Sequence, residues 1–214
     1  MKIDTVLFDL DGTLINTNEL IISSFLHTLE QYFPGQYGRN HIVGFIGEPL
    51  RESFERIDGE RVDELVGVYR RHNLENHDRL VREYDGVYDT VRMLHSLGFK
   101  LGVVTTKMGR TAKMGLRVAR LDRFFDVVVP LDDVSKAKPD PEPVNRALEL
   151  LGSTPETAMM VGDSPFDIEA GKNAGTYTAG VAWSIKGPGA LEAEGPDVML
   201  SKMPDLADIL GVKV

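Results

Sequence analysis

Residues 9–13 read Asp-Leu-Asp-Gly-Thr and follow directly after the apolar stretch 3–8, which has the length and composition of a buried β-strand. Asp9 and Asp11 are two residues apart, so on extended backbone both carboxylates point to roughly the same side. Gly12 would let the chain bend sharply after the second acid. Because open α/β sheets bind their ligands at the carboxyl ends of the strands, this acidic pair predicts a functional site. A plain strand with an Asp-Gly turn would leave the same pattern, so further motifs are needed to separate the two.

Apolar runs of strand length recur along the chain, with longer helical patterns between them. We expect strands at residues 3–8, 100–105, 127–130, 158–161 and 176–181, and helices at residues 89–97, 110–119, 141–151 and 167–174. Strands that alternate with helices favour a parallel sheet with right-handed crossover connections. The predicted fold class is therefore α/β.

The pattern changes between Thr17 and about Leu80, where no convincing strand occurs. Apolar residues recur there at helical spacing, at positions 20, 21, 25, 26, 29 and 33 and again at 62, 65, 66 and 69. We therefore expect a helical cap domain of residues 17–81, inserted into a core domain of residues 1–16 and 82–214. Its two linkers, near Asn16–Asn18 and Arg82–Gly86, are of the kind that permits motion of a lid.

The composition excludes several classes of function. The 214 residues include no cysteine, which excludes disulfides, thiol catalysis and thiolate metal sites and agrees with a cytoplasmic location. The net charge of −9 argues against a nucleic-acid partner, because a phosphate backbone requires a basic surface. No apolar run approaches the length of about 18 residues that a membrane span needs, and we expect no membrane partner. An anionic substrate would require a metal ion or a few local cations to reverse the field.

Short polar motifs follow four of the expected strands and connections. They are Asp9 with Asp11, the triplet Thr105-Thr106-Lys107, Lys138 before a proline, and Gly162-Asp163 with Asp167 four residues further on. Each has an ordinary explanation when taken alone; Asp167, for instance, could simply cap the helix that follows. Because parallel strands end at one edge of a sheet, we expect these side chains to meet there.

Phosphoryl transfer to a carboxylate uses all of these groups. Without a cysteine or a Ser/His arrangement, the available nucleophile is an aspartate. A carboxylate that attacks a phosphate dianion is repelled by it, so we expect Mg²⁺, held by the carboxylates of Asp9 and Asp163, to neutralise both. Thr105 can donate its hydroxyl to a phosphoryl oxygen, and Lys138 can pair with the nucleophile or the phosphoryl group. Asp11 can protonate the leaving oxygen and later deprotonate the attacking water.

On these four motifs, in this order, the chain resembles the haloacid dehalogenase-like (HAD) phosphatases. The resemblance spans essentially the whole sequence, and it implies a Rossmannoid parallel sheet with an inserted α-helical C1 cap. Within this family Asp9 would be the nucleophile and Asp11 the general acid and base. Mg²⁺ would be held by Asp9, by the backbone carbonyl of Asp11 and by Asp163, and Asp167 would support that site.

A narrower similarity is to the bacterial pyrophosphatases of this family. It rests on the segments 11–22, 104–107, 138–143 and 180–188. It implies hydrolysis of inorganic pyrophosphate, including the pyrophosphate released when the phosphocarrier protein HPr is dephosphorylated at a serine. Because the leaving group is itself a phosphate, we expect cations beyond those that serve the transferred group. The candidate substrate-binding residues are Thr105, Thr106, Lys107, Gly47 and Arg51, with Arg110 and Lys186 as further cations.

Other activities of the same machinery stay open. One is hydrolysis of a small monoester such as phosphoglycolate, and another is transfer of the phosphoryl group to a sugar, as in β-phosphoglucomutase. Dehalogenation is disfavoured by Asp11, since dehalogenases of this fold lack an acid at that position. A non-catalytic binding module would be expected to have lost Asp9, Asp11, Lys138 or Asp163, and all four are present.

Overall fold

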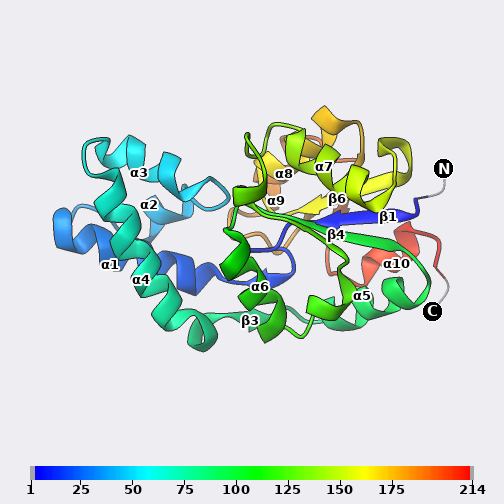
Figure 1. The fold of residues 1–214 in the computed structure, drawn as a ribbon, viewed down its shortest axis with the longest axis horizontal. Coiled ribbons are helices and arrows are strands. Elements are labelled where there is room, and N and C mark those ends of the chain that lie inside the picture. Colours follow the sequence, from blue (N-terminus) through cyan, green and yellow to red (C-terminus); the bar gives the residue numbers. More distant parts are fainter. Residues whose placement is uncertain (1–2, 213–214) are drawn as a thin grey trace.

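The computed structural model describes residues 3–212 and has the expected α/β architecture (Figure 1). Six parallel strands form one sheet in the order β5-β4-β1-β6-β7-β8. The strands are β1 (Thr5–Phe8), β4 (Lys100–Val104), β5 (Val127–Val129), β6 (Ala158–Gly162), β7 (Tyr177–Val181) and β8 (Val198–Leu200). The parallel sheet and its five expected strands are confirmed. Strand β8, at the edge of the sheet, was not expected.

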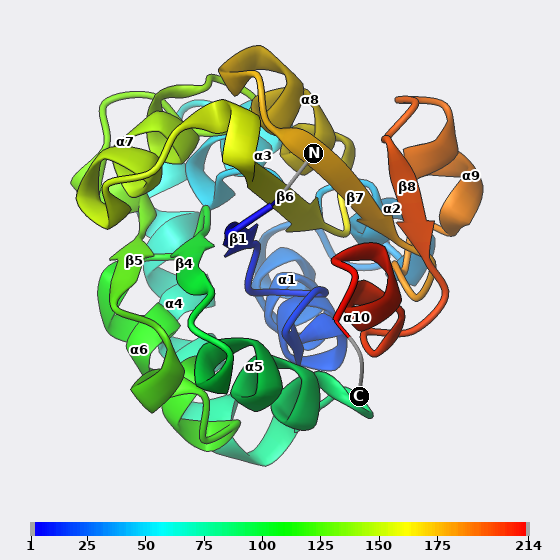
Figure 2. The same cartoon turned by 90° about the vertical axis from the view of Figure 1, so that its right-hand side faces the viewer.

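Helices cover both faces of the sheet, as Figure 2 shows in a view from the end opposite the cap helices. The central strand is buried on both sides: Val6 and Phe8 belong to one apolar cluster and Leu7 to the other. One face carries α5 (Val87–Ser96), α6 (Gly109–Val118) and α10 (Asp205–Ile209); the other carries α7 (Glu142–Leu151) and α8 (Pro165–Ala174). The short helix α9 (Pro188–Glu192) lies beside β7, and 3₁₀ turns span Asp122–Phe124, Leu131–Asp133 and Pro155–Thr157.

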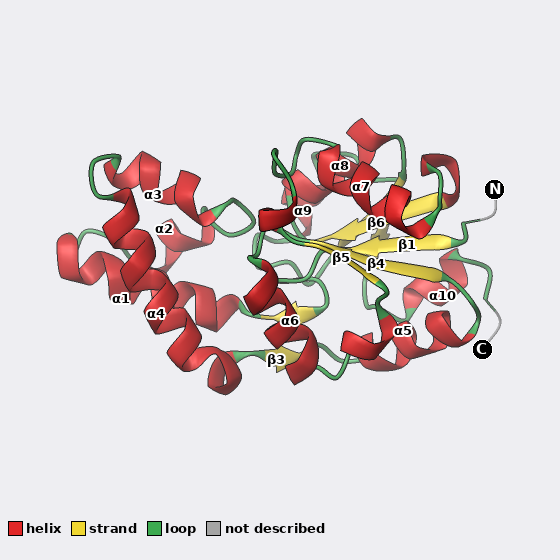
Figure 3. Cartoon of the chain, in the orientation of Figure 1, coloured by secondary structure: helices red, strands yellow, loops and turns green. Residues whose placement is uncertain are grey.

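An all-helical segment lies beyond the carboxyl ends of the strands (Figure 3). Its members, called the cap helices from here on, are α1 (Asn18–Tyr32), α2 (Arg39–Val43), α3 (Leu50–Asp58) and α4 (Val62–Leu80). They share an apolar core of their own, in which the ring centroid of Phe25 lies 5.2 Å from that of Phe54 and 4.9 Å from that of Tyr69. The two helical stripes of the sequence correspond to α1 and α4. Across residues 3–212, no helix combines the length and the apolar character that crossing a membrane requires.

The two connections to the cap helices are hydrogen-bonded to each other. Strand β2 (Ile15–Asn16) pairs antiparallel with β3 (Arg82–Glu83) in a separate two-stranded sheet. The sequence did not indicate this pairing, since a two-residue strand leaves no pattern. Gly86, which precedes α5, has a φ of 78°, and a Cβ there would lie 2.8 Å from Pro204 Cγ. It is a packed turn residue.

Candidate active site

The first motif is fixed in place by the central strand. The backbone N–H of Asp9 donates to the carbonyl of Val161 in β6 at 2.9 Å, which holds the buried Asp9 side chain at the end of the sheet. Gly12 follows with a φ of 88°, a conformation that favours glycine. A Cβ at Gly12 would lie 2.2 Å from Asp163 Oδ2, so the absence of a side chain there lets the fourth motif approach the first.

Lys138 joins the first and fourth motifs through its ammonium group. Its Nζ donates to Asp9 Oδ1 at 2.7 Å, to Asp167 Oδ1 at 2.5 Å and to the carbonyl oxygen of Val104 at 2.9 Å. The side chains of Lys138 and of its two charged partners are almost fully buried. The third motif, 129 positions away from Asp9 in the sequence, thus brings a positive charge directly onto that carboxylate.

The fourth motif is organised by short polar contacts. Asp167 Oδ2 accepts hydrogen bonds from the backbone N–H and the hydroxyl of Ser164, at 3.0 and 2.7 Å, in a capping box that begins α8. The hydroxyl of Ser184 donates to the backbone carbonyl of Asp163 at 2.6 Å. A Cβ on Gly162 would lie 2.2 Å from Asp167 Cβ, so Gly162 leaves the space that the Asp167 side chain fills.

Three buried carboxylates converge at this point. Each of Asp9, Asp163 and Asp167 offers an oxygen within 4.8 Å of the others. Burial, with a further contribution from Asp167, raises the pKa of Asp9 to about 7 although Lys138 opposes the shift. Burial and the charges of Asp9 and Asp167 likewise raise the pKa of Asp163 well above its usual value. One lysine does not balance three acids, and an oxygen-only donor set with excess negative charge fits a hard divalent cation such as Mg²⁺.

We expect the affinity for Mg²⁺ to depend on pH because protons compete for Asp9. Below its pKa of about 7 the metal-free Asp9 binds a proton, which the ion must displace, so affinity should fall by up to about tenfold from pH ~7.5 to pH ~6. Calorimetric titration at the two pH values would measure the change and the proton release. Asp163→Asn should weaken Mg²⁺ binding at both pH values. Asp11→Asn keeps the backbone carbonyl of residue 11 and should bind Mg²⁺ nearly as tightly as the parent does. Affinity that is the same at both pH values would contradict this prediction.

The second motif contacts the first through Lys107 and Asp11. Thr105 is buried, its hydroxyl accepts a hydrogen bond from the backbone N–H of Lys107 at 3.2 Å, and Lys107 Nζ lies 3.0 Å from each carboxylate oxygen of Asp11. The Asp11 side chain therefore points to Lys107, and it is not among the converging carboxylates. Any contribution of Asp11 to a metal site would come from its backbone, as the family resemblance implies.

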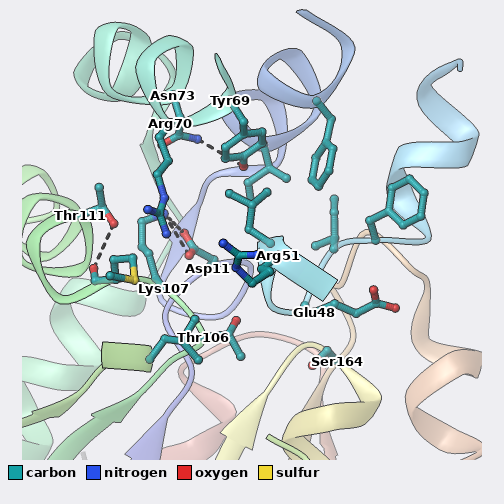
Figure 4. A pocket seen from close by; sticks show the side chains of 18 of the residues that line it. Asp11, Glu48, Arg51, Tyr69, Arg70, Asn73, Thr106, Lys107, Thr111 and Ser164 are labelled. Carbon is teal, nitrogen blue, oxygen red and sulfur yellow. Dashed lines mark hydrogen bonds and ion pairs between the residues drawn. The ribbon is translucent and has the colours of Figure 1, made fainter. Parts of the chain in front are cut away.

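A cavity of about 350 Å³ separates these motifs from the cap helices. It is the space shown in Figure 4, where Asp11, Lys107 and Thr106 border it from the sheet side and Arg51 reaches into it from the cap helices. The predicted residues that line it are Asp9, Asp11, Thr106, Lys107, Lys138, Gly47 and Arg51. The predicted residues Thr105, Asp163 and Asp167 do not line it and lie deeper in the protein.

The cations outside the main motifs differ in whether they border the cavity. Arg110, proposed only as a further cation, lines it, but Lys186 does not and instead lies 5.8 Å from the ring centroid of Phe166. Arg70 on α4 was missed because it stands in a charged helix beside Arg71. A signal was present: Tyr69 and Asn73 continue the buried stripe of α4, and Arg70 lies at its edge.

One wall of the cavity is apolar. Side chains from the cap segment and from the loop after β4 form it: Ile46 is buried, Leu74 is exposed, and Ile21, Phe45, Leu50 and Met108 are half-buried. The cavity thus has a charged floor at the sheet and an apolar upper wall.

Comparison with known proteins agrees with this arrangement. Residues 6–181 match the family described as haloacid dehalogenase-like hydrolase. The pyrophosphatase PpaX of Anoxybacillus flavithermus is 60% identical over 212 residues, 99% of each chain. PpaX of Halalkalibacterium halodurans is 57% identical over 213 residues, 100% of this chain and 99% of that one. A solved structure of a putative haloacid dehalogenase-like hydrolase from Bacteroides fragilis has a TM-score of 0.90 at 26% identity, covering 96% of this chain and 100% of that chain. With the four motifs assembled at the ends of its strands, the chain belongs to the haloacid dehalogenase-like hydrolases.

Proposed function

We propose that this chain is a Mg²⁺-dependent phosphohydrolase that cleaves inorganic pyrophosphate to orthophosphate through an aspartyl-phosphate on Asp9. The observation that carries the proposal is the Asp9–Lys138 pair beside Asp163 and Asp167, at the floor of a cavity that also holds Lys107. Relatives of 57–60% identity along their whole length are named pyrophosphatases. The sequence similarity extends the proposal to pyrophosphate from serine dephosphorylation of HPr.

Asp9 is the proposed nucleophile because it combines burial, a fixed position and a cationic partner. Lys138 bonds Asp9 Oδ1, which orients the carboxylate, and the same ammonium can attract the phosphoryl oxygens. Mg²⁺ bound by Asp9, the backbone carbonyl of Asp11 and Asp163 would supply the charge neutralisation that an approaching phosphate requires. Thr105 is assigned to a phosphoryl oxygen, although its position below the cavity floor requires the phosphoryl group to enter deeply.

Asp11 is the proposed general acid and base. Lys107 contacts both of its carboxylate oxygens, so an anionic substrate must draw Lys107 away before Asp11 can reach the leaving oxygen. Substrate binding and the release of Asp11 would then be one event. While no anion occupies the cavity, the contact with Lys107 would keep Asp11 from transferring a proton.

The domain division supports this chemistry. We propose that residues 17–81 form a cap domain that covers the site and that residues 1–16 and 82–214 form the catalytic core. The separate apolar core of the cap helices supports the division. The β2–β3 pair would act as the hinge, and its few backbone hydrogen bonds would keep the two connections together as the cap moves.

The apolar wall of the cavity favours a second candidate function. Pyrophosphate contains only phosphorus and oxygen, so it gains nothing from contact with Ile21, Leu50 or Leu74. A phosphate monoester with an organic group would use that wall. Hydrolysis of such a monoester, of the phosphoglycolate or a more apolar type, is therefore the alternative.

A substrate panel tests the proposal against its alternatives. Phosphate release is measured with pyrophosphate, phosphoglycolate, β-glucose-1-phosphate and p-nitrophenyl phosphate, with and without Mg²⁺. We expect activity only with the metal and a kcat/KM for pyrophosphate at least about tenfold above the others, or about 1.4 kcal/mol. A smaller preference would contradict pyrophosphate as the substrate and favour the monoester alternative. A requirement for a sugar bisphosphate would indicate the phosphotransferase.

A further inference from the structure

We propose that Arg70 of α4 selects a diphosphate over a phosphate monoester by binding the phosphoryl group that leaves. The inference rests on the proposed function, because it concerns the same cavity. It adds a specificity residue from the cap helices that neither the motifs nor the family match assigns.

The cations around the cavity differ in what already neutralises them. Lys138 is bonded to Asp9 and Asp167, Lys107 to Asp11, and Arg51 forms ion pairs with Asp63 and Glu55. For Arg70 and Arg110, by contrast, no carboxylate of residues 3–212 lies within 4.0 Å of the guanidinium. These two arginines therefore carry positive charge that a bound anion can use.

Arg70 is placed to act on the part of a substrate that leaves. It extends from α4 into the cavity, in the direction of Lys107 and Asp11, as Figure 4 shows. Its neighbours Tyr69 and Asn73 are buried in the same wall, which fixes the turn of helix that carries it. The phosphoryl group attacked by Asp9 lies at the floor, so the remainder of the substrate extends towards the cap helices and Arg70.

The charge on the leaving group decides which substrate benefits. In pyrophosphate cleavage a bond forms between an Asp9 oxygen and phosphorus, and the bridging P–O bond breaks. Its electron pair goes to the bridging oxygen, which departs as orthophosphate with a proton from Asp11; Asp11 takes up that proton from solvent once Lys107 has left its carboxylate. In the second step Asp11 accepts a proton from water, the water oxygen bonds to phosphorus, and the bond between phosphorus and the Asp9 oxygen breaks to release the second orthophosphate. An arginine binds two oxygens of that departing phosphate with charge-assisted hydrogen bonds. A monoester such as p-nitrophenyl phosphate loses an uncharged alcohol or phenol, which offers no such anionic pair of oxygens; phosphoglycolate is an intermediate case, because the glycolate that leaves carries a carboxylate.

The test compares two neighbouring arginines on one helix. Arg70 is replaced by glutamine, and Arg71→Gln is the matched control, since Arg71 is exposed and does not line the cavity. Arg70→Gln should lower kcat/KM for pyrophosphate by about 10- to 100-fold and that for p-nitrophenyl phosphate by less than about threefold. Arg71→Gln should change neither by more than about twofold, and Arg70→Lys should recover part of the loss. Unchanged pyrophosphate hydrolysis in Arg70→Gln, or equal losses on both substrates, would overturn the inference.

Inhibition separates this inference from the proposed function. If the parent enzyme cleaves p-nitrophenyl phosphate and not pyrophosphate, the proposed function fails, but pyrophosphate can still be measured as a competitive inhibitor. Arg70→Gln should then raise the inhibition constant of pyrophosphate at least about fivefold and leave that of orthophosphate nearly constant. Equal changes for both anions would reject Arg70 as the selective residue. Pyrophosphate that is neither cleaved nor inhibitory would reject both proposals.

Discussion

Asp9→Asn should abolish turnover of every substrate, with a loss of at least about 10⁴-fold in kcat, while the fold stays intact. An amide has the shape of the carboxylate, and its oxygen can still accept the hydrogen bond from Lys138 Nζ. It is too weak a nucleophile to attack phosphorus. The variant also removes one of the three converging negative charges, so the metal-free protein should melt at the same temperature as the parent or higher.

The matched control for Asp9→Asn lies at the other end of the same strand. Asp4 is exposed and accepts a hydrogen bond from the Thr5 hydroxyl at 2.8 Å, a contact that an amide oxygen preserves. Asp4→Asn should retain full activity in the same assay of phosphate release. Residual hydrolysis in Asp9→Asn above about one part in 10³ of the parent rate would contradict covalent catalysis by Asp9.

The parts of the site that follow from local sequence were predictable. The apolar run before Asp9 fixes the central strand, and the parallel topology brings the ends of β4 and β6 to the same edge. The sequence therefore indicated that Asp9, Thr105 and Asp163 lie at one edge. It left open whether Lys138 pairs with the nucleophile or with the phosphoryl group, and it did not indicate a bond from Lys138 to Asp167. That Lys138 bonds both Asp9 and Asp167 depends on side-chain directions that no spacing encodes.

Elements that depend on tertiary packing were the ones missed. Helix α3 does carry an apolar stripe, since Leu50, Phe54 and Ile57 stand at i, i+4 and i+7 and pack into the core of the cap helices, but its nine residues are too short for that stripe to stand out in the sequence. The pairing of β2 with β3 joins residues on either side of the whole cap segment. The cavity lining has the same origin: Arg70 and Leu74 approach the Asp11 side of the molecule only because α4 packs beside α6.

Lys138→Met should both inactivate the enzyme and destabilise it. The substitution leaves Asp9 and Asp167 buried without their cation, and breaking a buried pair in this way typically costs about 3–5 kcal/mol of the free energy of unfolding. Lys138 lowers the pKa of Asp9, so its removal raises that pKa above the parent's value of about 7, and the loss should be largest in metal-free protein at alkaline pH, where Asp9 is ionised. A carboxyl whose folded pKa is raised destabilises the fold when ionised, so stability should recover as the pH falls through that pKa. Added Mg²⁺ should restore part of it by supplying positive charge.

Lys136→Met is the control, because Lys136 lies two positions earlier in the same connection and is exposed, with its Nζ 3.4 Å from Asp140 Oδ2. An exposed ion pair contributes at most about 1 kcal/mol, so denaturant unfolding should show little change at either pH. Two buried acids that tolerate the loss of Lys138 at about pH 8 would have to be protonated already, or neutralised by another cation. A Mg²⁺ titration distinguishes the two cases. Protonated acids would bind Mg²⁺ weakly and release protons as they do so, whereas acids that another cation already neutralises would release no protons. A variant as stable as the parent at about pH 8 would therefore contradict the assignment of Lys138 as the cation that balances Asp9 and Asp167.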